Sequence, residues 1–223
     1  MLSSIFSFLI CVGITAAGAI WFFRRRDGTF ATFLTGALCF LISQPLLRIP
    51  LIRLLGQKSD WFTLLPYTHI VLYYLIMGFT AGVFEETARF VGLKIFRRGR
   101  TSWMNGIAYG LGHGGIEATW LFVMQVLPLI RQGQTGINLA IGAWERIFTI
   151  LVQIGLSFLV LYGIKTHRMR WLIIAIALHT LVDFLIIIGN VWIVEGLITV
   201  EGILSLIFVI KSKKKFDMGG ISL

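Results

Sequence analysis

Residues 64–93 read LLPYTHIVLYYLIMGFTAGVFEETARFVGL, and this stretch decides the fold class. No Asp, Glu, Lys or Arg occurs between Leu64 and Phe84. A helix rises ~1.5 Å per residue, so the stretch is long enough to cross ~30 Å of hydrocarbon. It nevertheless ends on Glu85, Glu86 and Arg89. Because ionisable side chains are expensive to bury in a membrane, these three residues point to function.

The composition extends this conclusion to the whole chain of 223 residues. Hydrophobic residues make up 57% and charged residues 13%, about half the charged share of a soluble globular protein. A soluble domain of this size could not bury so much apolar surface. Disordered, coiled-coil, collagen-like and disulfide-rich secreted proteins are excluded as well. The sequence therefore predicts an all-α polytopic membrane bundle, in which residues 1–223 form a single transmembrane domain.

Seven apolar stretches are long enough to be membrane spans. They are residues 2–23, 29–47, 64–93, 106–130, 146–164, 171–189 and 191–210. The chain has 20 Lys and Arg against 10 Asp and Glu, which in a soluble protein would suggest a nucleic-acid partner. Here the basic residues form short clusters between spans, a pattern that indicates membrane topology and no nucleic acid. The clusters are Arg24–Arg26, Lys94–Arg100, Lys165–Arg170 and Lys211–Lys215.

The same clusters predict the orientation of the protein in the cell membrane. If the N-terminus lies outside, 14 Lys and Arg fall in inner segments and 5 in outer segments, which favours an N-out, C-in topology. Residues 48–62 are then an outer loop, and Pro45 and Pro50 are expected to break the helix there.

The depths of the ionisable residues predict a shared site. Glu86 lies eight residues from the inner end of its span, and His113 and His179 lie eight and nine residues from theirs. All three are therefore ~12–14 Å below the inner surface, with Glu117 and Asp183 one turn deeper. Because random placement would not bring these groups to one level, we expect a polar cavity that opens toward the cytoplasmic half of the membrane.

Spacing within the helices predicts which side chains pair. His113 and Glu117 are four residues apart and share a face, as do His179 and Asp183, so each carboxylate is expected to orient its imidazole.

Adjacent residues on a helix point ~100° apart, so one acid of the Glu85–Glu86 pair can face the cavity while the other pairs with Arg89. Glycine stripes are expected to let the third and fourth spans touch and bring the acids near His113. These stripes are Gly78 and Gly82 on one span and Gly106, Gly110 and Gly114 on the other.

This set of residues suits hydrolysis of a peptide bond inside a membrane. The reaction needs water, a base to activate it, and donors for the oxyanion, which a carboxylate and two histidines could supply. Alternatively, Glu85, His113 and His179 could bind zinc, which would activate the water directly. The chain has no HExxH motif, so the interpretation without a metal cofactor comes first.

Three motifs occur in order along the chain: EETAR at 85–89, YGLGHGGIEA at 109–118 and HTLVD at 179–183. They resemble the motifs of the CPBP superfamily of intramembrane proteases, which includes CAAX prenyl proteases and bacteriocin-processing or immunity proteins. The second motif resembles the YhfC branch in particular. The two residues between the acidic pair and the arginine resemble the related PrsW type. The resemblance covers the motif-bearing core at about 64–190.

This resemblance implies a glutamate-type protease, in a superfamily whose members older labels call metalloproteases. Glu85 would be the base that activates water, and His113 would position that water or act as a second acid or base. His179 and Asp183 would bind the oxyanion and orient the site. The choice between Glu85 and Glu86 as the base stays open, because the spacing to the arginine is shorter than in the CAAX branch. The supporting residues would be Arg89 and Glu117.

The predicted function is an intramembrane endopeptidase that cleaves membrane-associated protein or peptide substrates near the cytoplasmic face. One alternative is a non-catalytic membrane scaffold or bacteriocin-immunity protein of the same fold, in which the buried acids serve packing. A proton-coupled transporter would also use buried Glu and His, but no inverted repeat supports it. No pattern in the sequence sets an oligomeric state.

Overall fold

The computed structural model describes residues 2–217, and almost all of them are helical. The α-helices are α1 (Leu2–Phe8), α2 (Ile14–Arg25), α3 (Thr29–Leu41), α4 (Ile49–Lys58), α5 (Asp60–Thr68), α6 (Ile70–Val91), α7 (Trp103–Leu121), α8 (Leu127–Arg131), α9 (Ile137–Lys165), α10 (Arg170–Phe184) and α11 (Val191–Asp217). π-helical turns η1 (Leu9–Gly13), η2 (Ile42–Arg48), η3 (Gly92–Phe96) and η4 (Phe122–Val126) and the 3-10 turn η5 (Leu185–Ile188) continue several of them. No strand occurs in residues 2–217, so the all-α prediction is confirmed.

Six helical segments are long and apolar enough to cross a membrane, and the protein is a multi-pass integral membrane protein. They are Leu2–Arg25, Thr29–Lys58, Ile70–Phe96, Ile137–Lys165, Arg170–Ile188 and Val191–Phe216. The predicted span at 106–130 folds as α7, η4 and α8 but is not among the six. Its five glycines and the polar residues His113 and Glu117 make it less apolar than the others. This helix lies inside the bundle, between α3 and α9.

The prediction that two prolines break the second span is wrong. The helix continues from Thr29 to Lys58, with Pro45 inside the π-helical turn η2 and Pro50 in the first turn of α4. A π-turn shifts the hydrogen-bond ladder, and the first turn of a helix does not use the missing N–H of proline, so both rings are accommodated. Consequently the third span begins at Ile70, and residues 60–68 form the separate helix α5. The fifth and seventh spans are longer than predicted, because α9 begins at Ile137 and α11 continues to Asp217.

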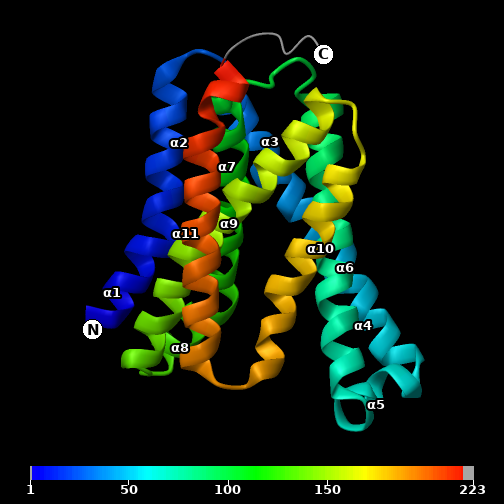
Figure 1. The fold of residues 1–223 in the computed structure, drawn as a ribbon. Helices are drawn as coiled ribbons and strands as arrows, with labels where there is room; N and C mark the ends of the chain where they lie inside the picture. Colours follow the sequence, from blue (N-terminus) through cyan, green and yellow to red (C-terminus); the bar gives the residue numbers. More distant parts are fainter. Residues whose placement is uncertain (1, 218–223) are drawn as a thin grey trace.

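The four basic clusters lie at one end of the bundle. Figure 1 shows that α2, α6, α9 and α11 all finish at this end, whereas α1, α5, α8 and the turn between α10 and α11 lie at the opposite end. We call the first of these the basic end. This arrangement is the one that the alternating topology requires, and the assignment of the basic end to the cytoplasm stays a prediction.

The prediction that the glycine stripes bring the third and fourth spans together is wrong. A Cβ atom at Gly78 or Gly82 on α6 would meet α10, and one at Gly106, Gly110 or Gly114 on α7 would meet α9. The sequence identifies the small residues but not the helix that packs against them. The closest approach of α7 is to α3, where Gly36 faces the backbone of Tyr109 and Gly112 faces the backbone of Phe33.

Replacing Gly112 with alanine should therefore force α3 and α7 apart. The added methyl group would overlap the carbonyl oxygen of Phe33, and overpacking of this kind costs about 1–3 kcal/mol. The matched control is Gly142→Ala on α9, where nothing lies within 4 Å and alanine favours the helix by up to ~1 kcal/mol. Thermal unfolding of both purified variants measures the difference. Equal melting temperatures would show that the α3–α7 contact is not tight.

Candidate active site

A cavity of about 900 Å³ lies between α6, α9, α10 and α11, with η2 and α7 completing its wall. The polar or ionisable side chains in its lining include Gln44, Arg48, Glu85, Glu117, Glu145, Arg146, Gln153, His179, Asp183 and Glu195. Such a concentration in the membrane-spanning part of a protein marks this cavity as the candidate site.

The cavity runs from Glu85 toward the end opposite the basic clusters. Its lining continues to Tyr73 near the start of α6 and to Gly189 and Val191 in the turn between α10 and α11. On the other side, Leu93, Tyr109 and Phe158 are at most 2% exposed and pack together as part of the main core. We call these three residues the sealing layer. The prediction of a cavity that opens toward the half with the basic clusters is therefore wrong, because the sealing layer fills that side.

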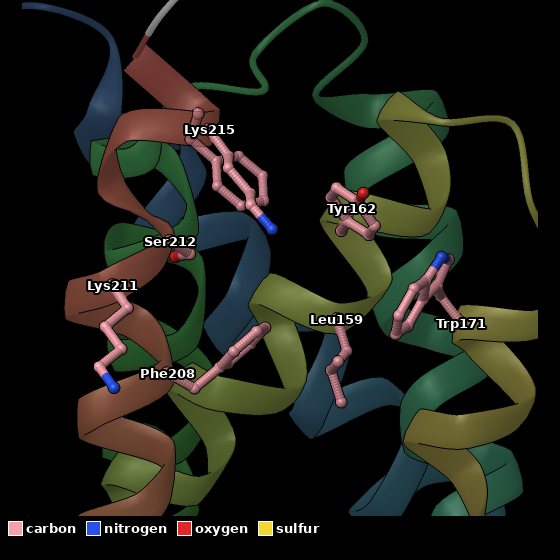
Figure 2. Close-up of a pocket in the computed structure, with 8 residues that line it drawn as sticks. Leu159, Tyr162, Trp171, Phe208, Lys211, Ser212 and Lys215 are labelled. Carbon is pink, nitrogen blue, oxygen red and sulfur yellow. The ribbon is translucent and has the colours of Figure 1, made fainter. Parts of the chain in front are cut away.

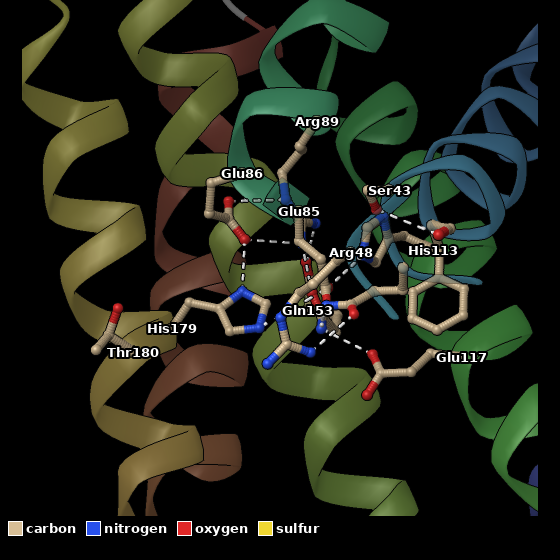
Figure 3. A network of polar contacts seen from close by, with 12 residues as sticks. Ser43, Arg48, Glu85, Glu86, Arg89, His113, Glu117, Gln153, His179 and Thr180 are labelled. Atoms are coloured by element: carbon tan, nitrogen blue, oxygen red, sulfur yellow. Dashed lines mark hydrogen bonds and ion pairs between the residues drawn. The ribbon is translucent and has the colours of Figure 1, made fainter. Parts of the chain in front are cut away.

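Glu85 lies at the inner end of this cavity and is only 4% exposed. Its Oε1 accepts a hydrogen bond from Gln44 Nε2 at 2.5 Å. Its Oε2 lies 2.8 Å from His113 Nε2 and accepts a longer bond from Gln153 Nε2 at 3.3 Å. His179 Nε2 lies 3.8 Å from the same oxygen (Figure 3). Four side chains from four different helical elements therefore converge on one carboxylate.

Glu86 faces away from the cavity and is fully buried against Arg89. Arg89 Nε and Nη2 donate to the two carboxylate oxygens of Glu86 at 2.9 and 3.1 Å. The same guanidinium donates to the backbone oxygen of Gln153 and to the hydroxyl of Ser157, at 2.9 and 2.5 Å. The prediction that one acid faces the cavity while the other pairs with Arg89 is confirmed, with Glu85 in the first role and Glu86 in the second.

The predicted pairs within single helices do not form. His113 contacts Glu85 rather than Glu117, and His179 Nδ1 contacts Glu86 Oε1 at 2.8 Å rather than Asp183. Both imidazoles point across the bundle to α6, where a buried carboxylate is aimed at each of them (Figure 3). A spacing of four residues places two side chains on one face, but the neighbouring helix decides their partners. Asp183 lines the cavity and makes no hydrogen bond within residues 2–217.

Glu117 completes a group of possible metal ligands. Glu85, His113 and Glu117 each offer one ligand atom, and these atoms lie within 4.8 Å of one another. The sequence predicted His179 as the third zinc ligand, beside Glu85 and His113. In the structure Glu117 is the third member of the group, and His179 Nδ1 contacts Glu86 instead. Glu117 also accepts hydrogen bonds from Gln153 Nε2 at 2.8 Å and from Arg146 Nη1 at 3.4 Å.

Three residues that hold Glu85 in place, directly or through one another, were not predicted from the sequence: Gln44, Arg48 and Gln153. Arg48 was placed in an outer loop, but its Nη1 donates to Gln44 Oε1 at 3.0 Å and its Nη2 to the backbone oxygen of Met77 at 2.5 Å. Because Arg48 can only donate, the amide NH₂ of Gln44 must face Glu85. Arg89 fixes Gln153 in the same way by donating to its Oε1, so the NH₂ of Gln153 faces Glu85 and Glu117. The sequence signal that could have identified Gln44 and Gln153 is a polar amide side chain within an apolar stretch.

The chain is similar to proteins of one family. The family model of the YhfC intramembrane metalloprotease matches residues 7–137 and 129–204 of the chain. The "Uncharacterized membrane protein YhfC" of Bacillus subtilis (strain 168) is 29% identical over an alignment 252 positions long, which covers 97% of this chain and 96% of that protein. No solved structure matches the chain.

Proposed function

The chain belongs to the YhfC intramembrane metalloprotease family, and on that premise we propose that it is an endopeptidase acting on membrane-associated proteins or peptides. The observation that carries the proposal is the position of Glu85. This carboxylate is buried, lies at the inner end of a cavity of about 900 Å³, and is oriented by Gln44, Gln153 and two imidazoles. A carboxylate with this access and orientation can serve as a general base.

In the proposed reaction, Glu85 takes a proton from a water molecule while the water oxygen bonds to the carbonyl carbon of the substrate peptide. The carbonyl π electrons move to its oxygen, and an N–H of His179 stabilises that oxyanion. Glu85 then gives the proton to the peptide nitrogen as the C–N bond breaks, releasing an amine and a carboxylic acid. Glu86 holds His179 through Nδ1, and Arg89 holds Glu86. Asp183 lines the cavity beside this centre and is proposed to orient the substrate.

The donors present suit a zinc ion as well. Glu85, His113 and Glu117 supply two carboxylate oxygens and one imidazole nitrogen, the donor types of a three-ligand catalytic zinc site. Bound zinc would lower the pKa of a water molecule and polarise the substrate carbonyl. The roles of His179, Glu86 and Arg89 as donors and supports are the same with or without the metal.

Metal content should discriminate between the two candidate ligand sets. If the centre uses zinc, purified wild type should contain about one zinc per chain, and His113→Ala and Glu117→Gln should each lower the zinc affinity at least about tenfold. His179→Ala should keep its zinc, because His179 is outside the group of close donor atoms. Elemental analysis after dialysis against graded zinc buffers measures this. Zinc lost from His179→Ala but kept in Glu117→Gln would restore the set predicted from the sequence.

We propose that cleavage occurs within the membrane on the side of the basic end. Glu85 lies eleven residues before Phe96, about 16 Å, and fifteen residues after Ile70, about 22 Å. Because the cavity extends toward the opposite end, the substrate segment would reach Glu85 from there or from between the helices. This proposal would be contradicted if all cut sites lay in the quarter of the membrane farthest from the basic end.

The proposal is tested by comparing new protein N-termini in membranes of cells that express wild type or Glu85→Gln at equal levels. N-termini that appear with wild type alone would establish a protease and identify its substrates. Identical sets of N-termini at equal expression would reject the endopeptidase and favour the non-catalytic scaffold or immunity protein.

Gln44 is expected to matter for the turnover number. Gln44→Leu removes the donor to Glu85 Oε1, and loss of a residue that orients a catalytic group typically lowers activity 10–100-fold. The expected decrease lies in kcat, with KM nearly unchanged, measured on a substrate from the N-terminal comparison. Gln57→Leu, an exposed residue of α4 outside the cavity, is the matched control. An unchanged kcat in Gln44→Leu would show that Glu85 is oriented without this amide.

A further inference from the structure

A second, smaller hollow lies at the basic end and shares no lining residue with the cavity of Glu85. It has a volume of about 190 Å³ and lies between α9, α10 and α11 (Figure 2). Its walls are aromatic and aliphatic, chiefly Tyr162, Trp171 and Phe208, whereas Lys211 and Lys215 supply its charge. We call it the basic-end groove. An apolar groove with cationic groups is suited to an amphiphile whose polar part is an anion.

The cations of the groove have no carboxylate partner among the side chains that the structure describes, residues 2–216. Neither Lys211 nor Lys215 forms an ion pair there, and the two lie one helical turn apart on α11. Lys165 adds a third ammonium group close by, since its Nζ donates to the backbone oxygen of Lys215 at 2.9 Å. Two lysines in the lining, a third lysine in contact with their helix, and no acid in the lining favour an anionic ligand.

Trp171 forms part of the aromatic wall of the groove. Its indole Nε1 is buried and has no hydrogen-bond partner in the described chain. Because this nitrogen is closed off from the groove as well as from solvent, Trp171 contributes its apolar ring to the groove and no hydrogen-bond donor. The hydroxyl oxygen of Ser212, which donates to Val209 O at 2.8 Å, adds a further polar atom in the wall.

The position of the groove relative to the membrane identifies the class of ligand. Trp171 is the second residue of α10 and Lys211 lies near the end of α11, so the groove is at the level where a span meets the headgroups. All four basic clusters are at this end, and anionic lipids are attracted to juxtamembrane basic segments by about 1 kcal/mol per residue. We propose that the basic-end groove binds an anionic phospholipid. Its phosphate would lie beside Lys211 and Lys215 on α11, and an acyl chain would follow Phe208 and the ring of Trp171.

Quenching of tryptophan fluorescence by brominated lipids tests this proposal at Trp171 itself. The full chain is reconstituted in phosphatidylcholine vesicles that contain a minor fraction of brominated phosphatidylglycerol or brominated phosphatidylcholine. The difference between wild type and Trp171→Phe isolates the Trp171 signal. We expect brominated phosphatidylglycerol to quench this signal at least about twofold more than the zwitterionic lipid at equal mole fraction, because a bound anionic lipid exceeds its bulk share.

Two double variants of lysines on α11 distinguish binding in the groove from a general effect of surface charge. Lys211→Gln with Lys215→Gln should abolish the excess quenching. Lys213→Gln with Lys214→Gln makes the same change in charge beside the groove and should retain it. Equal loss in both double variants, or equal quenching by both lipids in wild type, would overturn the proposal. Removal of the excess by inorganic phosphate would assign the groove to a soluble anion and also overturn it. The result does not depend on protease activity.

Discussion

Replacing Glu85 with glutamine should lower the rate of substrate cleavage about 10³-fold without preventing insertion of the protein. Glutamine has the same shape as glutamate but cannot accept the proton of the attacking water, and loss of a general base costs 10²–10⁴-fold. Glu85 makes its contacts at 2.5–3.3 Å to groups that an amide oxygen can still satisfy in part, so the fold should persist. The measurement is a single-turnover assay on a reconstituted substrate, with size-exclusion profiles compared between wild type and variant.

The control for burial is Glu201→Gln on α11. Glu201 carries a buried oxygen that has no hydrogen-bond partner among the described residues. It lies outside the cavity, so its replacement should change the rate less than twofold. Glu86→Gln tests the choice between the two acids. Full activity in Glu85→Gln combined with loss in Glu86→Gln would move the base to Glu86. Full activity in both variants would reject a glutamate-based mechanism.

Arg89→Met should have the largest effect on stability. Arg89 is fully buried and donates to Glu86, Gln153 and Ser157, so its removal leaves a buried carboxylate without its cation. Breaking a buried ion pair from one side costs about 3–5 kcal/mol. For a protein of this size, that loss corresponds to a melting temperature lower by roughly 10 °C. Thermal unfolding in detergent, followed by loss of the monodisperse peak, measures it.

The control for Arg89 is Arg53→Met, which removes an exposed arginine of α4. A surface change of this kind is expected to stay within ~0.5 kcal/mol of wild type. The double variant Glu86→Gln with Arg89→Met should be less destabilised than the sum of the two single changes, because it leaves no uncompensated carboxylate. An unchanged melting temperature in Arg89→Met would show that the pair contributes nothing to the fold.

The depth of each ionisable residue along its helix predicted most of the candidate site. Counting residues from the span ends placed Glu86, His113 and His179 at one level, and in the structure both histidines contact the Glu85–Glu86 pair. This succeeded because helix rise is constant and the spans are nearly parallel. The same counting could not identify the partners of the histidines, since rotation of one helix relative to the next depends on packing.

The helix partners and the cavity opening could not be predicted for a related reason. Gly78 and Gly82 signal close approach of some helix, but only the tertiary fold shows that it is α10. Pro45 led to the prediction of a break because proline usually ends a helix. The π-helical turn that accommodates Pro45 cannot be recognised from the composition. Gln44 and Gln153 were overlooked because an uncharged amide in a span carries a weak signal, and their role arises from the arginine that orients each of them.

The sealing layer has a consequence for the cell that makes this protein. In the proposed reaction, water enters the cavity of Glu85, and this carboxylate takes up and gives back protons. Leu93, Tyr109 and Phe158 pack between that acid and the basic end. Protons exchanged at Glu85 in this reaction would therefore return to the side from which the water came. A hydrolytic centre placed in this way would let no protons pass from one side of the membrane to the other.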